Sequence, residues 1–153
     1  MANSNYAAIL AAVVEVVQGV SGVGVVHNRQ RFLPVWKDFL AAHSSGGILN
    51  GWSVSRETSP EDPLTNRETD RSHVFVIRSW FGMNDAAASE NTFQARLESV
   101  CDAFRAVANY DLGGAAEWTL PAAVRLVQLR EIGGVLCHYG EITVTAHERI
   151  ARG

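Results

Sequence analysis

The sequence is short of cysteine, of net positive charge and of recognisable catalytic motifs, and each shortage excludes a class of protein. Only two cysteines occur, Cys101 and Cys137, and both stand inside apolar patterns, which favours buried free thiols over a disulfide or a redox pair. The formal net charge is −3, whereas a protein that coats nucleic acid needs many Lys and Arg contacts to phosphate. We therefore expect neither a disulfide scaffold nor a tight DNA-binding protein.

The five histidines do not form a metal-binding pattern. No two of them stand four residues apart, HExxH is absent, and the adjacent Cys137 and His138 point to opposite faces of an extended chain. No serine lies in a GxSxG motif, and neither cysteine stands in a recognisable nucleophile motif. The sequence therefore predicts no enzyme activity, no metal site and no cofactor.

Length and composition are those of one ordinary folded domain, with 153 residues, 47% of them hydrophobic and 19% charged. The apolar run at 7–17 resembles the apolar part of a leader peptide, but no Lys or Arg precedes it and Glu15 interrupts it. It is also too short to span a bilayer. We expect no membrane association and a location in the compartment of synthesis, a reducing cytoplasm.

The strongest structural pattern is VLCHYGEITVTAHE at 135–148. Its alternate residues separate onto two faces of a strand, and one face is purely apolar after His138, with Ile142, Val144 and Ala146. This pattern predicts a strand whose second half lies on the hydrophobic core.

Periodicity and turn residues predict the other elements. Helices are expected at 6–18, at 33–43 and from 85 or 89 to about 109, with the first one capped by Asn3, Ser4 or Asn5. Further strands are expected at 48–58, 71–81 and 123–129, with a short one near Val25. Together they predict a single α+β domain over residues 1–153, with a mostly antiparallel sheet of about four to five strands and helices packed on one side.

The candidate contact residues are charged residues of a long connection and two tryptophans. The connection at 59–70 is expected to be a surface loop or hairpin tip, since it is polar and holds two of the four prolines. Four charged residues in it or just after it are expected to project toward a partner, namely Glu61, Asp62, Arg67 and Arg71. Trp52 and Trp118 are expected at an interface, with core packing as the alternative, and Trp36 and Trp80 in the core.

Four segments together resemble a family of small proteins of tailed bacteriophages. They are VVHNRQRF (25–32), GWSVSRE (51–57), HVFVIRSWFGMNDAAASENTFQARLESV (73–100) and GGVLCHYGEITVTAHE (133–148). The most specific parts are FVIRSWFG followed by DAAASENTFQ, and GVLCHYGEI. The family is that of minor tail and tail-completion proteins, and the order of elements is similar to that of tail terminators of long-tailed phages.

The resemblance implies a tail-terminator-like fold and a structural role in the virion. The protein would form a ring, a hexamer, that caps the completed tail tube at the head-proximal end of the tail and joins it to the head connector. Its partners would be further copies of itself, the tail tube protein and the head–tail connector or neck proteins. Genomic DNA would pass through the lumen without specific binding, and assembly would take place in the host cytoplasm.

Two other functions stay open. A head-side neck or connector protein of the same virion would also form a ring, but it would bind the portal complex. A small cytoplasmic ligand-binding or enzymatic α+β domain would need a deep pocket with convergent ionisable groups.

Overall fold

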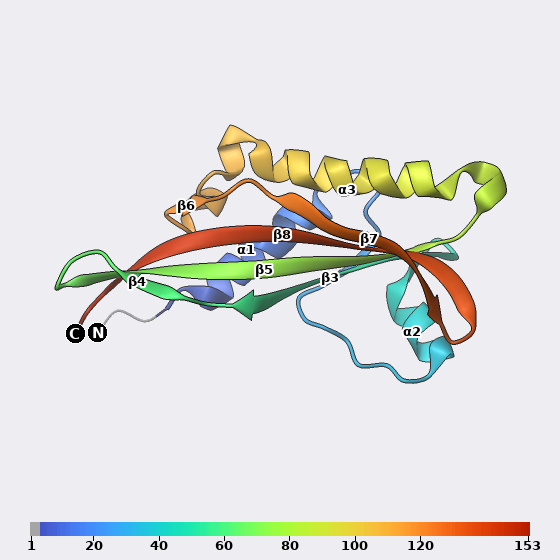
Figure 1. Cartoon of the computed structure of the whole chain (residues 1–153), viewed down its shortest axis with the longest axis horizontal. Helices are drawn as coiled ribbons and strands as arrows, with labels where there is room; N and C mark the ends of the chain where they lie inside the picture. The colour runs from blue at the N-terminus through green and yellow to red at the C-terminus, as the bar shows by residue number, and fades with distance from the viewer. Residues whose placement is uncertain (1–3) are drawn as a thin grey trace.

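Two long strands run side by side through the middle of the sheet (Figure 1). The computed structural model describes residues 4–153, and in it β5 (Glu68–Gly82) pairs antiparallel with β8 (Val135–Ala151) over the whole length of β5. The predicted core face of β8 is confirmed, because Ile142, Val144 and Ala146 are buried among apolar side chains.

The sheet has eight strands, so the predicted number of four to five is wrong. A mostly antiparallel α+β arrangement is confirmed, with β3 (Ile48–Thr58), β5, β8 and β7 (Ala123–Ile132) as consecutive neighbours. The other strands are β1 (Val25–His27), β2 (Ser44–Ser45), β4 (Glu61–Pro63) and β6 (Trp118–Thr119). Segments of two or three residues are too short to show alternation. Of these four short strands only β1, which pairs parallel with β3, was expected from the sequence.

One face of the sheet is covered by α1 (Tyr6–Gln18) and α3 (Ser89–Arg105). The first helix has the predicted bounds, whereas α3 ends before the predicted Asn109 because Ala106 leaves the helical conformation. Short 3-10 turns flank α3, namely η1 (Asp85–Ala87), η2 (Val107–Asn109) and η3 (Leu112–Gly114). The buried apolar residues between this face and the helices form the main core, which includes Ile9, Trp52, Phe75, Ile77, Phe93, Leu97 and Ile142.

The second helix, α2 (Trp36–His43), lies on the opposite face, so the prediction that all helices pack on one side is wrong. In Figure 1 it lies below the strands, whereas α3 lies above them. Phe39 packs with Leu49 and Cys137 in a second apolar cluster, and these two strand residues alternate with those of the main core. Trp36 and Trp80 pack against this cluster, as predicted.

The connection at 59–70 is the predicted hairpin tip. Within it β4 pairs with the start of β5, and Leu64 and Thr65 close the turn through backbone bonds to Glu68. Together with the end of β8, these strands extend as a ribbon beyond the helices, beside the C-terminus (Figure 1). We call residues 59–72 and 147–153 the ribbon.

The cap of α1 agrees with the prediction in part. Ser4 Oγ accepts a hydrogen bond from the Tyr6 backbone N–H at 3.3 Å, whereas the Asn5 side chain makes no cap bond and Asn3 lies outside the described residues. In addition, the carboxylate of Glu148 on β8 accepts hydrogen bonds from the Asn5 backbone N–H at 2.9 Å and from Ser4 Oγ at 2.8 Å. Among the described helices, none is long and apolar enough to cross a membrane.

Candidate interaction surfaces

The ribbon carries the four charged residues that the sequence singled out, but it does not bring all of them together. Arg71 forms an ion pair with Glu61 across the β4–β5 pairing. Asp62 and Arg67 are exposed, and the carbonyl of Arg67 accepts a hydrogen bond from the Arg152 backbone N–H at 2.7 Å. The pair of Glu61 and Arg71 therefore joins neighbouring strands, while Asp62 and Arg67 present charge to solvent.

Trp52 does not lie at the surface, so its predicted place at an interface is wrong. Its side chain is 0% exposed in the main core, and its Nε1 donates a hydrogen bond to Asn50 Oδ1 at 3.0 Å. The alternation of β3 turns Trp52 and Val54 toward α1 and α3, where a partner protein has no access.

Trp118 is half-buried at the base of the ribbon. Its ring stacks on His147, with ring centroids 4.7 Å apart, and His147 Nδ1 lies 2.9 Å from Asp70 Oδ2. The outer part of this tryptophan is accessible, so its expected interface role stays a prediction.

A chain of charged and polar side chains crosses the face of the sheet opposite the main core. Arg125 of β7 donates to Glu57 Oε2 at 2.7 Å and to Glu141 Oε1 at 2.9 Å, and Tyr139 donates to Glu141 Oε2 at 2.5 Å. Burial alone would raise the pKa of Glu141, but the hydrogen bonds from Tyr139 and Arg125 outweigh it and lower that pKa. Burial and the bond to Glu141 raise the pKa of Tyr139 to about 12. This network fixes β7 to β8 and β3.

A serine and a histidine meet at the start of α3, beside a hollow of about 390 Å³. Ser89 Oγ lies 2.8 Å from His138 Nε2, and it accepts a hydrogen bond from the Asn84 backbone N–H at 2.9 Å. The preceding Ala88 has the left-handed φ of 52°. Burial lowers the pKa of His138, which favours the neutral ring. The contact of Ser89 with His138 joins α3 to β8.

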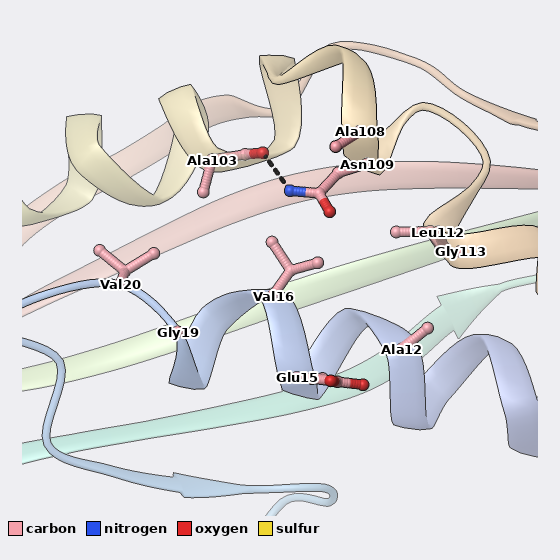
Figure 2. A pocket seen from close by; sticks show the side chains of 10 residues that line it. All are labelled: Ala12, Glu15, Val16, Gly19, Val20, Ala103, Ala108, Asn109, Leu112 and Gly113. Carbon is pink, nitrogen blue, oxygen red and sulfur yellow. Dashed lines mark hydrogen bonds between the residues drawn. The ribbon is translucent and has the colours of Figure 1, made fainter.

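A groove of about 400 Å³ lies between α1 and the turns that follow α3 (Figure 2). Small and apolar residues form most of its walls, and Asn109 Nδ2 donates to the Ala103 carbonyl at 2.8 Å. Of the side chains that line it, Glu15 carries the charge. The groove therefore offers apolar surface, without the convergent ionisable groups expected of an enzyme pocket.

The outer edge of β7 is a surface that the sequence did not reveal. β7 pairs with β8, and its residues are exposed or half-buried along the whole strand. Five large apolar side chains on or next to it are between 37% and 50% exposed: Leu120, Val124, Leu129, Val135 and Leu136. We call this strand edge with its five side chains the β7 edge. Alternation shows which residues share a face of a strand, but it does not show which strand is outermost.

No model of a known protein family matches the chain, and no curated protein is significantly similar to it in sequence. Among residues 4–153, no three His, Cys, Asp or Glu side chains are grouped so that they could hold a metal ion.

Proposed function

We propose that this chain is a structural virion protein, a tail terminator that forms a ring on the end of the phage tail tube and joins it to the head connector. The observation that supports this proposal is that contact surfaces of two kinds lie on different parts of one sheet. The β7 edge carries exposed apolar side chains and runs along the side of the sheet, whereas the ribbon presents exposed charges and extends from its end (Figure 1). A ring subunit needs one pair of surfaces for its neighbours and another surface for the partner on the ring axis.

The ribbon suits the axial partner because its exposed charges are held on paired strands. The Glu61–Arg71 ion pair and the pairing of β4 with β5 hold the hairpin together, and Asp62 and Arg67 point charge of both signs into solvent. Charged groups at a rim direct encounter and select partners more than they add affinity. In this role the ribbon contacts the tail tube or the connector.

The charge of the chain agrees with the passage of DNA through such a ring. Tight binding of DNA requires many phosphate contacts from Lys and Arg, whereas this chain has 13 of these residues against 16 Asp and Glu. A lumen formed by such subunits would let DNA move without being held.

The test is the solution mass of the purified protein, measured by light scattering over a range of concentrations and followed by negative-stain imaging. A closed ring with a mass of roughly six times 16.6 kDa supports the proposal. Tail tubes assembled from the tube protein of the same phage are then added, and the ring is expected at one end of each tube. A chain that stays a 16.6 kDa monomer with and without tubes contradicts the proposal.

The second candidate, a head-side neck or connector protein, differs in the partner of the ribbon. The charged ribbon would then bind the portal complex, and the purified ring would co-sediment with portal rings in place of tail tubes. One sedimentation experiment with both partners separates the two functions.

A further inference from the structure

We infer that copies of this chain join through backbone pairing of the β7 edge of one copy with residues 54–58 of β3 in the next copy. Both are outer edges of the same sheet, on opposite margins. β7 has β8 as its strand neighbour, and the outer side of β3 is paired with β2 at 48–49 and with β1 at 51–53. Among the described residues, 54–58 have no strand on that side, and a bulge lies between Arg56 and Thr58, so the outward backbone groups up to this bulge can pair with another chain.

Strand direction favours this heterologous contact. The strands β3, β5, β8 and β7 alternate in direction, so β7 runs opposite to β3. Antiparallel addition of the next β3 to β7 gives that strand the direction of the first β3. Every copy then follows the one before it by the same rotation, and such head-to-tail contacts close into a ring when the rotation permits.

The edges differ in how they are protected against pairing. β4 lies on the margin of the ribbon, and Pro60 and Pro63 remove backbone donors there, which is a common way to block a strand edge. The ten residues of β7 include no proline, and beyond a bulge at Arg125 the strand is regularly paired to Ile132. Val124 and Leu129 of this strand are apolar and exposed, and the exposed Leu120, Val135 and Leu136 lie next to it. A regular strand edge without proline and with exposed apolar side chains can pair with another strand.

Charges on the two edges are complementary. Arg130 and Glu131 are consecutive in β7, as are Arg56 and Glu57 in β3. One antiparallel register places Arg130 opposite Glu57 and Glu131 opposite Arg56, and opposite charges across a strand pair are stabilising.

The faces of the sheet also agree with this register. Arg130 lies 3.6 Å from the ring centre of Tyr139, and Glu57 binds Arg125, so both are on the face opposite the main core. Arg56 lies over the ring of Tyr6 on α1, at 4.3 Å, and therefore on the main-core face. Glu131 follows Arg130 in β7, so its side chain lies on the main-core face, as that of Arg56 does. Each opposite pair would thus lie on one face of a continuous sheet.

The occupant is therefore a second copy of this chain, and the number of copies in a closed assembly rests on the proposed ring function. The first test is Leu129→Lys, which places a charge on the β7 edge at a side chain that is 50% exposed. The matched control is Val107→Lys, which changes a 91% exposed valine outside the sheet. We expect the first variant to lose the oligomer and sediment at 16.6 kDa, the control to keep it, and both to keep the thermal unfolding temperature of the wild type.

The second test is chemical cross-linking, which depends on proximity and not on loss of assembly. A Glu131→Cys and Arg56→Cys double variant, with the two thiols directly opposite each other in this register, is treated with a bis-maleimide, while the native Cys101 and Cys137 are buried. We expect a ladder of linked copies from the double variant and no linked species from either single variant. A linked dimer from Glu131→Cys alone would show pairing of two β7 strands and overturn the inference.

The two proposals fail in different ways. A ring that persists in Leu129→Lys, without a ladder from the double cysteine variant, overturns the edge pairing and leaves the terminator function standing. A cross-linked ladder from open chains that never close overturns the ring function and leaves the edge pairing standing. A monomer that gives no ladder at any protein concentration, both with and without tail tubes, overturns both.

Discussion

His73 Nε2 donates a hydrogen bond to Glu148 Oε1 across β5 and β8 at 2.8 Å, and both side chains are buried. The same carboxylate accepts bonds from Ser4 and from the backbone of Asn5, so it ties the start of α1 to the strands that continue into the ribbon. Arg56 Nη1 lies 3.1 Å from the other nitrogen of His73. This chain of polar contacts holds the first helix where the sheet leaves the main core.

Replacement of Glu148 by Gln is expected to lower the free energy of unfolding by about 1–3 kcal/mol at neutral pH, because buried donors lose a charged acceptor. Burial would raise the pKa of Glu148, but the hydrogen bonds from His73, Asn5 and Ser4 outweigh it and hold that pKa below the ordinary value of 4.5. The folded state therefore binds this proton less readily than the unfolded state. The stabilisation is complete above the ordinary pKa and disappears as the pH falls through the folded-state pKa.

The measurement is urea unfolding of the wild type and the variant at about pH 7 and about pH 3, since the difference between them should shrink at the lower pH. Glu117→Gln is the matched control, because this exposed carboxylate precedes β6 and its removal should change neither value. If Glu148→Gln lowered the free energy of unfolding equally at both pH values, the lowered pKa of Glu148 would not explain its effect on stability.

The helix cap shows where sequence reasoning stops. The bounds of α1 and β3 follow from local periodicity, since residues within one element report which side of it is apolar. Glu148 is 143 residues from Asn5, and no local pattern indicates that a strand carboxylate binds Ser4 and the Asn5 backbone at the start of this helix. The position of α2 on the face opposite the main core could not be predicted either. The apolar stripe of a helix does not show which face of a sheet the helix covers.

The interaction surfaces were predicted unevenly. The hairpin at 59–70 could be found from its prolines and charges, which are direct signals of an exposed turn. The abundance of tryptophan at contact surfaces favours an interface for Trp52, but Trp52 and Val54 are two residues apart in β3 and share the face that lies on the main core. The β7 edge depends on the order of strands in space, and that order is set by the long β5–β8 pairing and not by β7 itself.

Gly51 lies against α2 so closely that a methyl group there has no room. A Cβ at this position would lie 2.4 Å from His43 Cβ, and His43 is itself packed between Phe39 and Trp80. We expect Gly51→Ala to lower the free energy of unfolding by about 1–3 kcal/mol through overpacking, as measured by urea unfolding. Gly82→Ala is the control, since the nearest atom to its Cβ would be at an ordinary 3.8 Å. Equal stability of the two variants would show that α2 moves aside without cost.

The two carboxylates that bind Arg125 are expected to differ in importance. Glu141 is buried and also accepts a bond from Tyr139, so Glu141→Gln should lower the free energy of unfolding by about 1–3 kcal/mol. Glu57 is exposed, and ion pairs in solvent contribute little, so Glu57→Gln should change stability much less. Urea unfolding of both variants at low and high salt checks this order. Salt screens the exposed ion pair of Glu57 more strongly, so the small effect of Glu57→Gln should shrink further at high salt. A larger effect for Glu57→Gln would contradict this order.

Charge reversal on the ribbon tests the contact with the tail or connector. Arg67→Glu combined with Asp62→Lys changes two exposed side chains and leaves the Glu61–Arg71 pair in place, so stability and ring mass should stay as in the wild type. Binding of the ring to tail tubes should weaken by about tenfold or more, because like charges then face each other across the rim of the contact. Arg105→Glu, on the exposed end of α3, is the control and should bind as the wild type does. Co-sedimentation at several protein concentrations gives the affinities, and unchanged binding of the double variant would show that the ribbon does not contact the tube.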